Sequence, residues 1–331
     1  MRLVSFQVHD YTSIGLILHE TGFGVYQEDE ASIIDLYEGF AVLLHEEGKT
    51  RAKELSDAVV SRRMETFLEG GEDSLAAANR VLERFRGMHP EDDQNRGIDG
   101  RPIVYHRKEV HLLAPVRRPP RIICLSHNYH DFIEETGVAV PPEPRIFSKY
   151  FNAICGPEDP IIYPPMTQEL GYEAELAFVV GKRGRYIPED KAYDYIAGYT
   201  IFNDISASDL TARDKISVVR GKTFDNFAPC GPWLVTKDEI EDCHALHIEC
   251  RVNGKVLQES NTKNLIYDVP KLVSFLSEIF TLEPGDIVAT GTPGGLAKHR
   301  NPKAFMQVGD VCEVEVEKLG VLRNTIVREH V

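Results

Sequence analysis

Short apolar runs separated by glycine and polar turns occupy the beginning of the chain, at residues 3–8, 14–18 and 24–26. Runs of this length, bounded by turn residues, predict strands of a small sheet. Apolar residues then recur at helical spacing over residues 51–68 and again over 74–85. This change of period predicts two helices that pack on the sheet, and so a small α+β unit.

Strand-like runs dominate the remainder of the chain, and residues 269–279 form its clearest helical pattern. Many strands without regular alternation with helices favour a mixed α/β, β-rich fold over a Rossmann fold. The proline- and arginine-rich stretch at 117–121 marks a boundary. We therefore predict a small N-terminal α+β domain at residues 1–117 and a larger domain at 118–331. The predicted strands of the larger domain are 122–125, 176–180, 199–202, 247–252, 287–290 and 311–316.

The formal net charge of the chain is −15, which changes the set of expected partners. A surface this acidic repels phosphate backbones and anionic lipids, so we expect no nucleic acid and no membrane as partners. No apolar stretch approaches the length of a membrane span. The six cysteines include no C-x-x-C pair, which favours buried reduced thiols over disulfides or a zinc site. Together these features predict a soluble, cytoplasmic protein.

Three acidic residues form the most informative pattern in the sequence. Glu173 and Glu175 are two apart in a predicted strand, so both carboxylates project from one face, and a second strand ends at Asp204. If the strands are neighbours, three carboxylates converge and need a cation. An all-oxygen ligand set suits Mg²⁺ or Mn²⁺, and Ca²⁺ also fits it. The alternative is an edge strand whose polar face carries two glutamates without a metal.

Several long motifs in this part of the chain resemble the fumarylacetoacetate hydrolase family. The first is GYEAELAFVVGKRGRYIPEDKAYDYIAGYTIFNDISASDL, and RGKTFDNFAPCGPWLV and LEPGDIVATGTPGG follow it in order. The resemblance covers roughly residues 118–327. It implies a mixed β-sandwich roll, assembly as a homodimer, and Mg²⁺ held by residues that match Glu173, Glu175 and Asp204. It also implies a small-molecule 2-oxo acid as substrate.

The same resemblance assigns roles to residues around the expected metal. Lys222 matches a lysine beside the metal-bound oxygens, where a cation would stabilise an enolate oxygen. Gly291 and Thr292, in a glycine-rich turn after a strand, match a site for the substrate carboxylate. Lys149 and Tyr129 match further substrate-binding positions. Solvated side chains and an ordinary turn are the alternatives.

The chain departs from the family pattern where acid–base chemistry is expected. The family pairs a histidine with a glutamate to activate water; here Phe132 stands at the histidine position, and Glu135 is retained. Ser208 and Thr211 replace the usual Arg and Gln after the third acidic ligand. His130 and Glu134 are four apart on a predicted helix and could form a displaced pair. The alternative is that they are surface residues.

These features lead to a ranked set of hypotheses about the reaction. The first is metal-dependent cleavage of a C–C bond in a 2,4-dioxo acid, of the fumarylacetoacetate or acylpyruvate hydrolase type, through a metal-stabilised enolate. The second is decarboxylation or keto–enol tautomerisation of an oxaloacetate-like acid, which needs no attacking water. The third is a non-catalytic protein that binds a 2-oxo acid on the same fold.

Overall fold

A 12-stranded mixed sheet is the central element of the fold. The computed structural model describes residues 1–18, 31–214 and 217–329. Its order is β4-β3-β2-β1-β14-β12-β11-β17-β6-β7, with β5 paired to β1 and β8 paired to β14. The predicted strand at 24–26 lies outside the described residues. The strands are β1 (Arg2–Val8), β2 (Tyr11–Leu18), β3 (Ser32–Asp35), β4 (Val104–His106), β5 (His111–Leu113), β6 (Ile122–Ser126), β7 (Arg145–Lys149), β8 (Ile154–Cys155), β11 (Ala174–Val180), β12 (Ile196–Asn203), β14 (Ala228–Thr236) and β17 (Ile287–Ala289).

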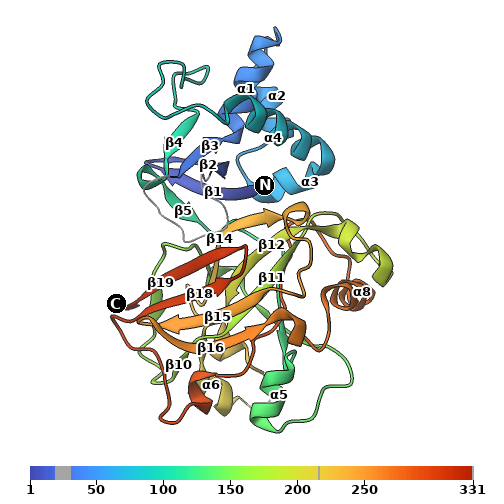
Figure 1. Cartoon of the computed structure of the whole chain (residues 1–331), viewed down its shortest axis with the longest axis vertical. Coiled ribbons are helices and arrows are strands. Elements are labelled where there is room, and N and C mark those ends of the chain that lie inside the picture. Colours follow the sequence, from blue (N-terminus) through green and yellow to red (C-terminus); the bar gives the residue numbers. More distant parts are fainter. Residues whose placement is uncertain (19–30, 215–216, 330–331) are drawn as a thin grey trace.

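A five-stranded sheet packs against the central part of the long sheet, which gives the lower half of the molecule a sandwich form (Figure 1). Buried and partly exposed residues alternate along β18, as expected for a strand with one face on a core. This observation, together with the sheet topology, confirms the predicted β-rich mixed α/β fold. In order, the sheet contains β16 (Lys255–Asn261), β15 (His247–Val252), β18 (Val311–Val316), β19 (Gly320–Arg328) and β9 (Ile161–Tyr163).

Helices gather in two places, as Figure 1 shows. Four of them lie beside the N-terminal strands, and the others lie around the larger half of the molecule. The first group is α1 (Leu36–Glu46), α2 (Ala52–Val59), α3 (Met64–Glu69) and α4 (Gly71–Phe85); the second is α5 (His130–Thr136), α6 (Ser208–Arg213), α7 (Val219–Lys222) and α8 (Val269–Ile279).

The structure confirms the predicted strands of the larger half, and helix α8 has the predicted bounds. Two predictions for the N-terminal part were wrong. Helix α1 was not expected, because its short apolar sequence directly follows a strand and its buried positions extend around most of the helix. The single helix expected at 51–68 is two helices, α2 and α3. They are separated at Ser61, whose φ of 48° is incompatible with a continuous helix.

The N-terminal part is joined to the larger part by strand pairing. Strand β1 lies antiparallel to β14, with Arg2 opposite Val235 and Leu3 opposite Leu234. Buried apolar side chains of both parts also belong to one continuous core. The division at residue 117 stays a prediction. A domain boundary there would lie between two parts that share one sheet and one core.

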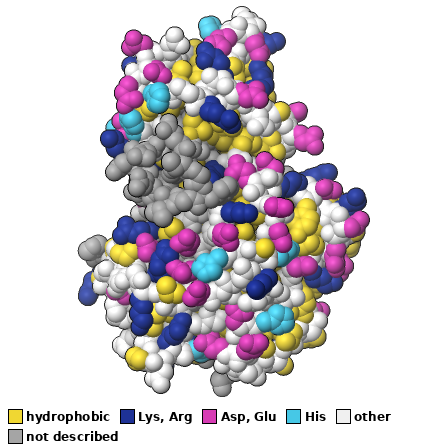
Figure 2. All heavy atoms as spheres, in the orientation of Figure 1, with side chains coloured by type: hydrophobic (Ala, Val, Ile, Leu, Met, Phe, Trp, Pro, Cys, Tyr) yellow, Lys and Arg dark blue, Asp and Glu magenta, His cyan; other side chains and the backbone are white. Residues whose placement is uncertain are grey.

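The surface and the cysteines bear on the composition-based expectations. On the face shown in Figure 2, acidic and basic side chains are interspersed. Within the described residues, none of the helices combines the length and the apolar character that crossing a bilayer requires. All six cysteines are buried free thiols, as predicted.

Asp35 provides a pH-dependent contribution to stability in the N-terminal part. Its fully buried carboxylate caps helix α1 by accepting the N–H of Glu38, and it accepts the hydroxyls of Tyr11 and Ser13. Burial raises its pKa to about 7, although the hydrogen bonds that it accepts act in the opposite direction. Because this pKa is above that of an unfolded chain, the protonated form stabilises the fold, and this stabilisation is lost between about pH 4 and pH 7.

We expect Asp35→Asn to remove this pH dependence while keeping the helix cap, because asparagine is also a good N-cap residue. The difference in unfolding free energy between variant and wild type should shift in favour of the variant by about 2–4 kcal/mol from pH 4 to pH 8. Urea denaturation at several pH values measures this. Parallel stability curves for the two proteins would contradict it.

Candidate metal centre and catalytic site

The site lies where two neighbouring strands leave the long sheet together. Strands β11 and β12 pair antiparallel, with Ala174 opposite Asn203. Just beyond that pair, the two segments form a separate small ladder of β10 (Leu170–Gly171) and β13 (Ser206–Ala207). Glu173 and Asp204 occupy the junctions between the ladders, and the Asp204 N–H donates to the Glu173 carbonyl at 2.9 Å. The split in the sheet therefore places these two acidic side chains next to each other.

Glu175 completes an acidic triad with Glu173 and Asp204. One carboxylate oxygen from each residue lies within 4.8 Å of the others. Glu175 and Asp204 are fully buried, and Glu173 is partly exposed. Strand β11 lies between β12 and β17, so it is an inner strand of the sheet. The edge position that the alternative interpretation assumed for this strand is therefore not what the structure shows.

Two buried lysines offset part of the negative charge of this triad. Lys222 Nζ lies 2.8 Å from Glu173 Oε1 and 2.6 Å from Asp204 Oδ2. Lys149 Nζ lies 2.5 Å from Asp204 Oδ1. Burial acts to raise the pKa of Asp204, but the two ammonium groups outweigh it and hold that pKa below its usual value. Asp204 is therefore ionised at neutral pH, as a metal ligand must be.

Lys149 does not have the position expected of a substrate-binding residue. Its side chain is fully buried, and it donates to Asp204, to the Ile205 carbonyl at 3.1 Å and to the Phe227 carbonyl at 2.5 Å. A lysine ammonium has three N–H donors, and all three are engaged by the protein. Lys149 thus fixes Asp204 and the segments around it and leaves no donor for a substrate.

Lys222 reaches the triad from the short helix α7, which packs closely on α6. A Cβ added at Gly221 would lie 2.8 Å from the Ala207 carbonyl oxygen and 2.4 Å from Thr211 Cγ2. Only glycine allows this close approach, and the approach brings the next residue, Lys222, to the site. Thr211 and Ser208 bond to each other through the Thr211 hydroxyl and the Ser208 carbonyl. Thr211 and Ser208, which differ from the family pattern, therefore belong to the segment that packs against the helix carrying Lys222.

Glu175 is the member of the triad whose charge is least compensated. Burial, followed by the negative charges of Asp204 and Glu173, raises its pKa well above the usual value. Its Oε2 accepts the Gly291 N–H at 2.7 Å, whereas its Oε1 is buried without a hydrogen-bond partner within the described part of the chain. A buried unpartnered carboxylate oxygen beside two other carboxylates is costly unless a cation binds it. The triad therefore fits a divalent cation, and its oxygens suit Mg²⁺ or Mn²⁺.

The glycine-rich turn after β17 contacts the triad directly. Gly291 has a φ of 98°, and a Cβ there would approach Asn128 Cβ to 3.0 Å, so a side chain would be strained. Its N–H is engaged by Glu175, which means that this donor holds a protein carboxylate and not a substrate anion. The hydroxyl of Thr292 accepts from Gln258 Nε2 at 2.8 Å.

Gln258 is a site residue that the sequence did not reveal. It is fully buried in β16, and its Oε1 accepts the N–H of Ala174, the residue between the two glutamates, at 3.0 Å. Its Nε2 donates to Thr292 and to the Pro293 carbonyl at 3.0 Å. One side chain therefore connects the start of strand β11 to the glycine-rich turn. No role was assigned to Gln258 from the sequence, because a buried glutamine in a strand forms no local chemical pattern.

We expect Gln258→Leu to lower the unfolding free energy by about 1–3 kcal/mol, because the buried Ala174 N–H loses its acceptor. Urea denaturation of the metal-free protein measures this. Gln307→Leu is the matched control: Gln307 is exposed, and its loss should change stability by less than about 0.5 kcal/mol. Equal effects of the two substitutions would contradict the role given to Gln258.

Five of the residues singled out from the sequence lie in helix α5 or directly before it. Tyr129 precedes the helix; it is fully buried, and its hydroxyl lacks a hydrogen-bond partner among the described residues. Burial, with the nearby charge of Glu175, raises its pKa. His130 and Glu134 are exposed, and no ion pair or hydrogen bond joins them in the described chain. The structure thus does not form the displaced pair that their spacing suggested.

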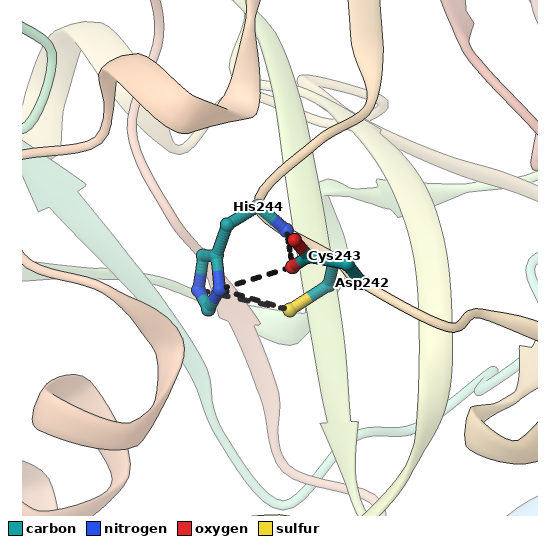
Figure 3. A group of neighbouring side chains, drawn as sticks. All are labelled: Asp242, Cys243 and His244. Carbon is teal, nitrogen blue, oxygen red and sulfur yellow. Dashed lines mark hydrogen bonds and ion pairs between the residues drawn. The ribbon is translucent and has the colours of Figure 1, made fainter.

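Among the described residues, two other groups have ligand-type side chains, and neither resembles a metal centre. Figure 3 shows Asp242, Cys243 and His244, consecutive residues with the imidazole beside the thiol and the carboxylate. His244 Nε2 accepts the Val269 N–H at the start of α8 at 3.1 Å, and burial raises the pKa of the Cys243 thiol. These residues support a helix terminus. The second group, His247, Glu249 and Glu259, lies on strands β15 and β16, where Glu249 pairs with Arg251.

The chain is similar to known proteins over almost its whole length. It is 40% identical over 330 residues to the mitochondrial oxaloacetate tautomerase fahd2 of Xenopus laevis, covering 99% of this chain and 90% of that protein. It is 43% identical over 272 residues to the mitochondrial oxaloacetate tautomerase FAHD2A of Bos taurus, covering 82% of each. An uncharacterised protein of Archaeoglobus fulgidus is 48% identical over 235 residues, or 70% of this chain and 90% of that one.

Solved structures agree with these sequence matches. A fumarylacetoacetate hydrolase from the psychrophilic Exiguobacterium antarcticum is 29% identical with a TM-score of 0.73, covering 99% of this chain and 100% of that one. A 2-hydroxyhepta-2,4-diene-1,7-dioate isomerase from Mycobacterium marinum is 27% identical with a TM-score of 0.70, covering 100% of both chains. The fumarylacetoacetate (FAA) hydrolase C-terminal family model matches residues 121–327. This chain therefore belongs to the fumarylacetoacetate hydrolase family of enzymes.

Proposed function

We propose that the protein is a divalent-metal-dependent enzyme that interconverts the keto and enol forms of oxaloacetate. The observation that carries the proposal is the acidic triad of Glu173, Glu175 and Asp204, with Lys222 beside it and a buried Glu175 oxygen that has no hydrogen-bond partner among the described residues. Similarity to proteins called oxaloacetate tautomerases, over 82–99% of the chain, supports the choice of reaction.

The three carboxylates would hold Mg²⁺ or Mn²⁺, which acts as a Lewis acid toward a keto oxygen. Lys222 contributes a fixed positive charge at the partly exposed side of the triad, next to Glu173. Burial acts to lower the pKa of Lys222, but Asp204 and Glu173 raise it above the usual value, so the ammonium stays charged. A fixed positive charge in this position would stabilise negative charge on an enolate oxygen.

Keto–enol interconversion requires only proton transfer, since no water molecule attacks the substrate. The family pattern has a water-activating histidine where Phe132 stands, and a reaction without an attacking water does not need that histidine. Phe132 belongs to a small apolar cluster with Tyr129, Leu265 and Leu296. This cluster provides an apolar wall beside the site, which excludes water and strengthens electrostatic interactions inside it.

Cleavage of a C–C bond in a 2,4-dioxo acid, the first hypothesis from the sequence, is the second candidate. It is supported by the similarity to the hydrolase from Exiguobacterium antarcticum over 99% of the chain. It requires an activated water molecule in addition to the metal. Homodimer assembly and a cytoplasmic location remain predictions; the matched tautomerases are described as mitochondrial.

Purified protein with Mg²⁺ should be incubated separately with oxaloacetate and acetylpyruvate, while the enol absorbance and the release of pyruvate are followed. Faster keto–enol equilibration of oxaloacetate, without pyruvate and abolished by EDTA, supports the proposal. Pyruvate from oxaloacetate would instead indicate decarboxylation, and pyruvate plus acetate from acetylpyruvate would indicate hydrolysis. Thermal stabilisation by oxalate without any turnover would indicate a binding protein.

A further inference from the structure

One imidazole–carboxylate pair in the described chain contacts the glycine-rich turn that also contacts the acidic triad. His299, at the end of a short 3₁₀ helix (Ala297–His299), places Nδ1 3.5 Å from Glu135 Oε2. The other such pairs lie in the N-terminal part, next to helix α8 or on strand β15. The pair at Glu135 is therefore the one that is placed to take part in the chemistry of the site.

Two connections link this pair to the triad. Glu135 Oε2 accepts the Gly295 N–H at 2.8 Å, and Gly291, four residues earlier in the same turn, donates to Glu175 at 2.7 Å. Four Cα–Cα steps span at most about 15 Å, so both carboxylates are held by one short turn. The approach is close, because a Cβ at Gly294 would lie 3.3 Å from Glu135 Oε2.

Helix α5 provides the second connection. Burial and the nearby charge of Glu175 raise the pKa of the Tyr129 hydroxyl. One turn later, the Phe132 ring packs against the His299 ring, with centroids 6.0 Å apart. Tyr129 and Phe132 belong to one apolar cluster, which Leu296 also joins from the segment that carries His299. His299 thus stands at the end of an apolar wall that begins beside the metal ligands.

The chemistry of the pair suits proton transfer. With Nδ1 facing the carboxylate, the neutral imidazole carries its proton there, and Nε2 has a free lone pair and no hydrogen-bond partner among the described residues. The His299 and Glu135 side chains are 28% and 29% exposed, so the imidazole can exchange protons with water. A base oriented by a carboxylate is the usual arrangement for general base catalysis.

We propose that His299 is the base that moves the substrate proton and that Glu135 is the residue that positions it. This inference rests on the proposed function. His299 Nε2 takes a proton from C3 of the keto acid, and the C–H electron pair becomes the C2=C3 bond. The carbonyl electron pair moves to the C2 oxygen, which takes a proton from water. The imidazolium then returns its proton to water, so that the net change is isomerisation.

Enolisation of oxaloacetate by the Mg²⁺-loaded full-length protein tests this assignment, with deuterium incorporation at C3 in D₂O followed by NMR. We expect His299→Ala and His299→Gln to lower kcat about 100-fold with KM within about threefold. Added imidazole should restore part of the activity of His299→Ala, an effect that a purely structural role would not produce. Glu135→Gln should lower kcat about 10-fold.

His130→Ala is the matched control, because His130 lies on the same helix as Glu135 but is exposed, and its turnover should stay within about twofold of wild type. Mn²⁺ binding by the His299 variants should equal that of wild type. An active wild type with fully active His299 variants would overturn the assignment and leave the proposed function standing. A wild type with no turnover of oxaloacetate would overturn the proposed function and this assignment with it.

Discussion

Glu175→Gln should abolish metal-dependent turnover, with a fall in kcat/KM of about 1,000-fold or more. This is the rate equivalent of the several kcal/mol that a bound metal ion supplies. The substitution keeps the size of the side chain and an acceptor for the Gly291 N–H. It removes the buried charge whose Oε1 has no other partner in the described structure. Mn²⁺ titration followed by electron paramagnetic resonance should show binding weakened at least 100-fold.

The metal-free Glu175→Gln protein should unfold at a temperature equal to or above that of metal-free wild type, because a poorly compensated buried charge is removed. This separates loss of the metal from loss of the fold. Glu259→Gln is the control, since Glu259 is exposed and belongs to another acidic group. Its turnover and Mn²⁺ binding should match wild type. Undiminished Mn²⁺ binding by Glu175→Gln would disprove a metal centre at the triad.

The strands of the larger half could be predicted from the sequence because their apolar runs are long and bounded by turns. Helix α8 begins with a clear signal, Asp268 as N-cap followed by a proline, and its bounds were predicted correctly. Helix α1 lacks such a contrast with the strand before it. Its Asp35 cap is followed by a run in which most residues are buried, and a short apolar run does not distinguish helix from strand.

The acidic residues of the site could be found because carboxylates two apart in a strand, and a third at a strand end, form a local pattern. The environment of these residues depends on contacts between distant segments. Lys149 is 55 residues from Asp204, and Gln258 is 84 residues from Ala174. Spacing in the sequence does not reveal that the donors of Lys149 are all used inside the protein.

Contacts between distant segments also explain why the acid–base pair could not be predicted. The spacing of His130 and Glu134 on one helix face suggested a pair, and both side chains are exposed. The imidazole near Glu135 comes instead from His299, which is 164 positions further along the chain. Local helical spacing can propose a pair, but only the packing of the turn at 291–295 against α5 brings Glu135 and His299 together.

Lys149→Met should lower the unfolding free energy of the metal-free protein by about 3–5 kcal/mol, the largest stability change that we expect from one substitution. Lys149 and Asp204 are both fully buried, and their ion pair spans 2.5 Å. Methionine keeps most of the volume but leaves Asp204 with Lys222 as its remaining cation. It also leaves the carbonyls of Ile205 and Phe227 without this donor.

Urea denaturation measures the loss, and Lys303→Met is the matched control. Lys303 forms an exposed ion pair with Glu169 at 3.1 Å, and pairs of this kind contribute at most about 1 kcal/mol. In a double-mutant cycle with Asp204→Asn, the loss of stability in the double variant should be smaller than the sum of the two single losses. The reason is that a neutral side chain at position 204 no longer needs the ammonium. If Lys149→Met and Lys303→Met unfold at the same urea concentration, the carboxylate of Asp204 does not depend on Lys149. Its charge in the folded protein must then be balanced by Lys222 alone.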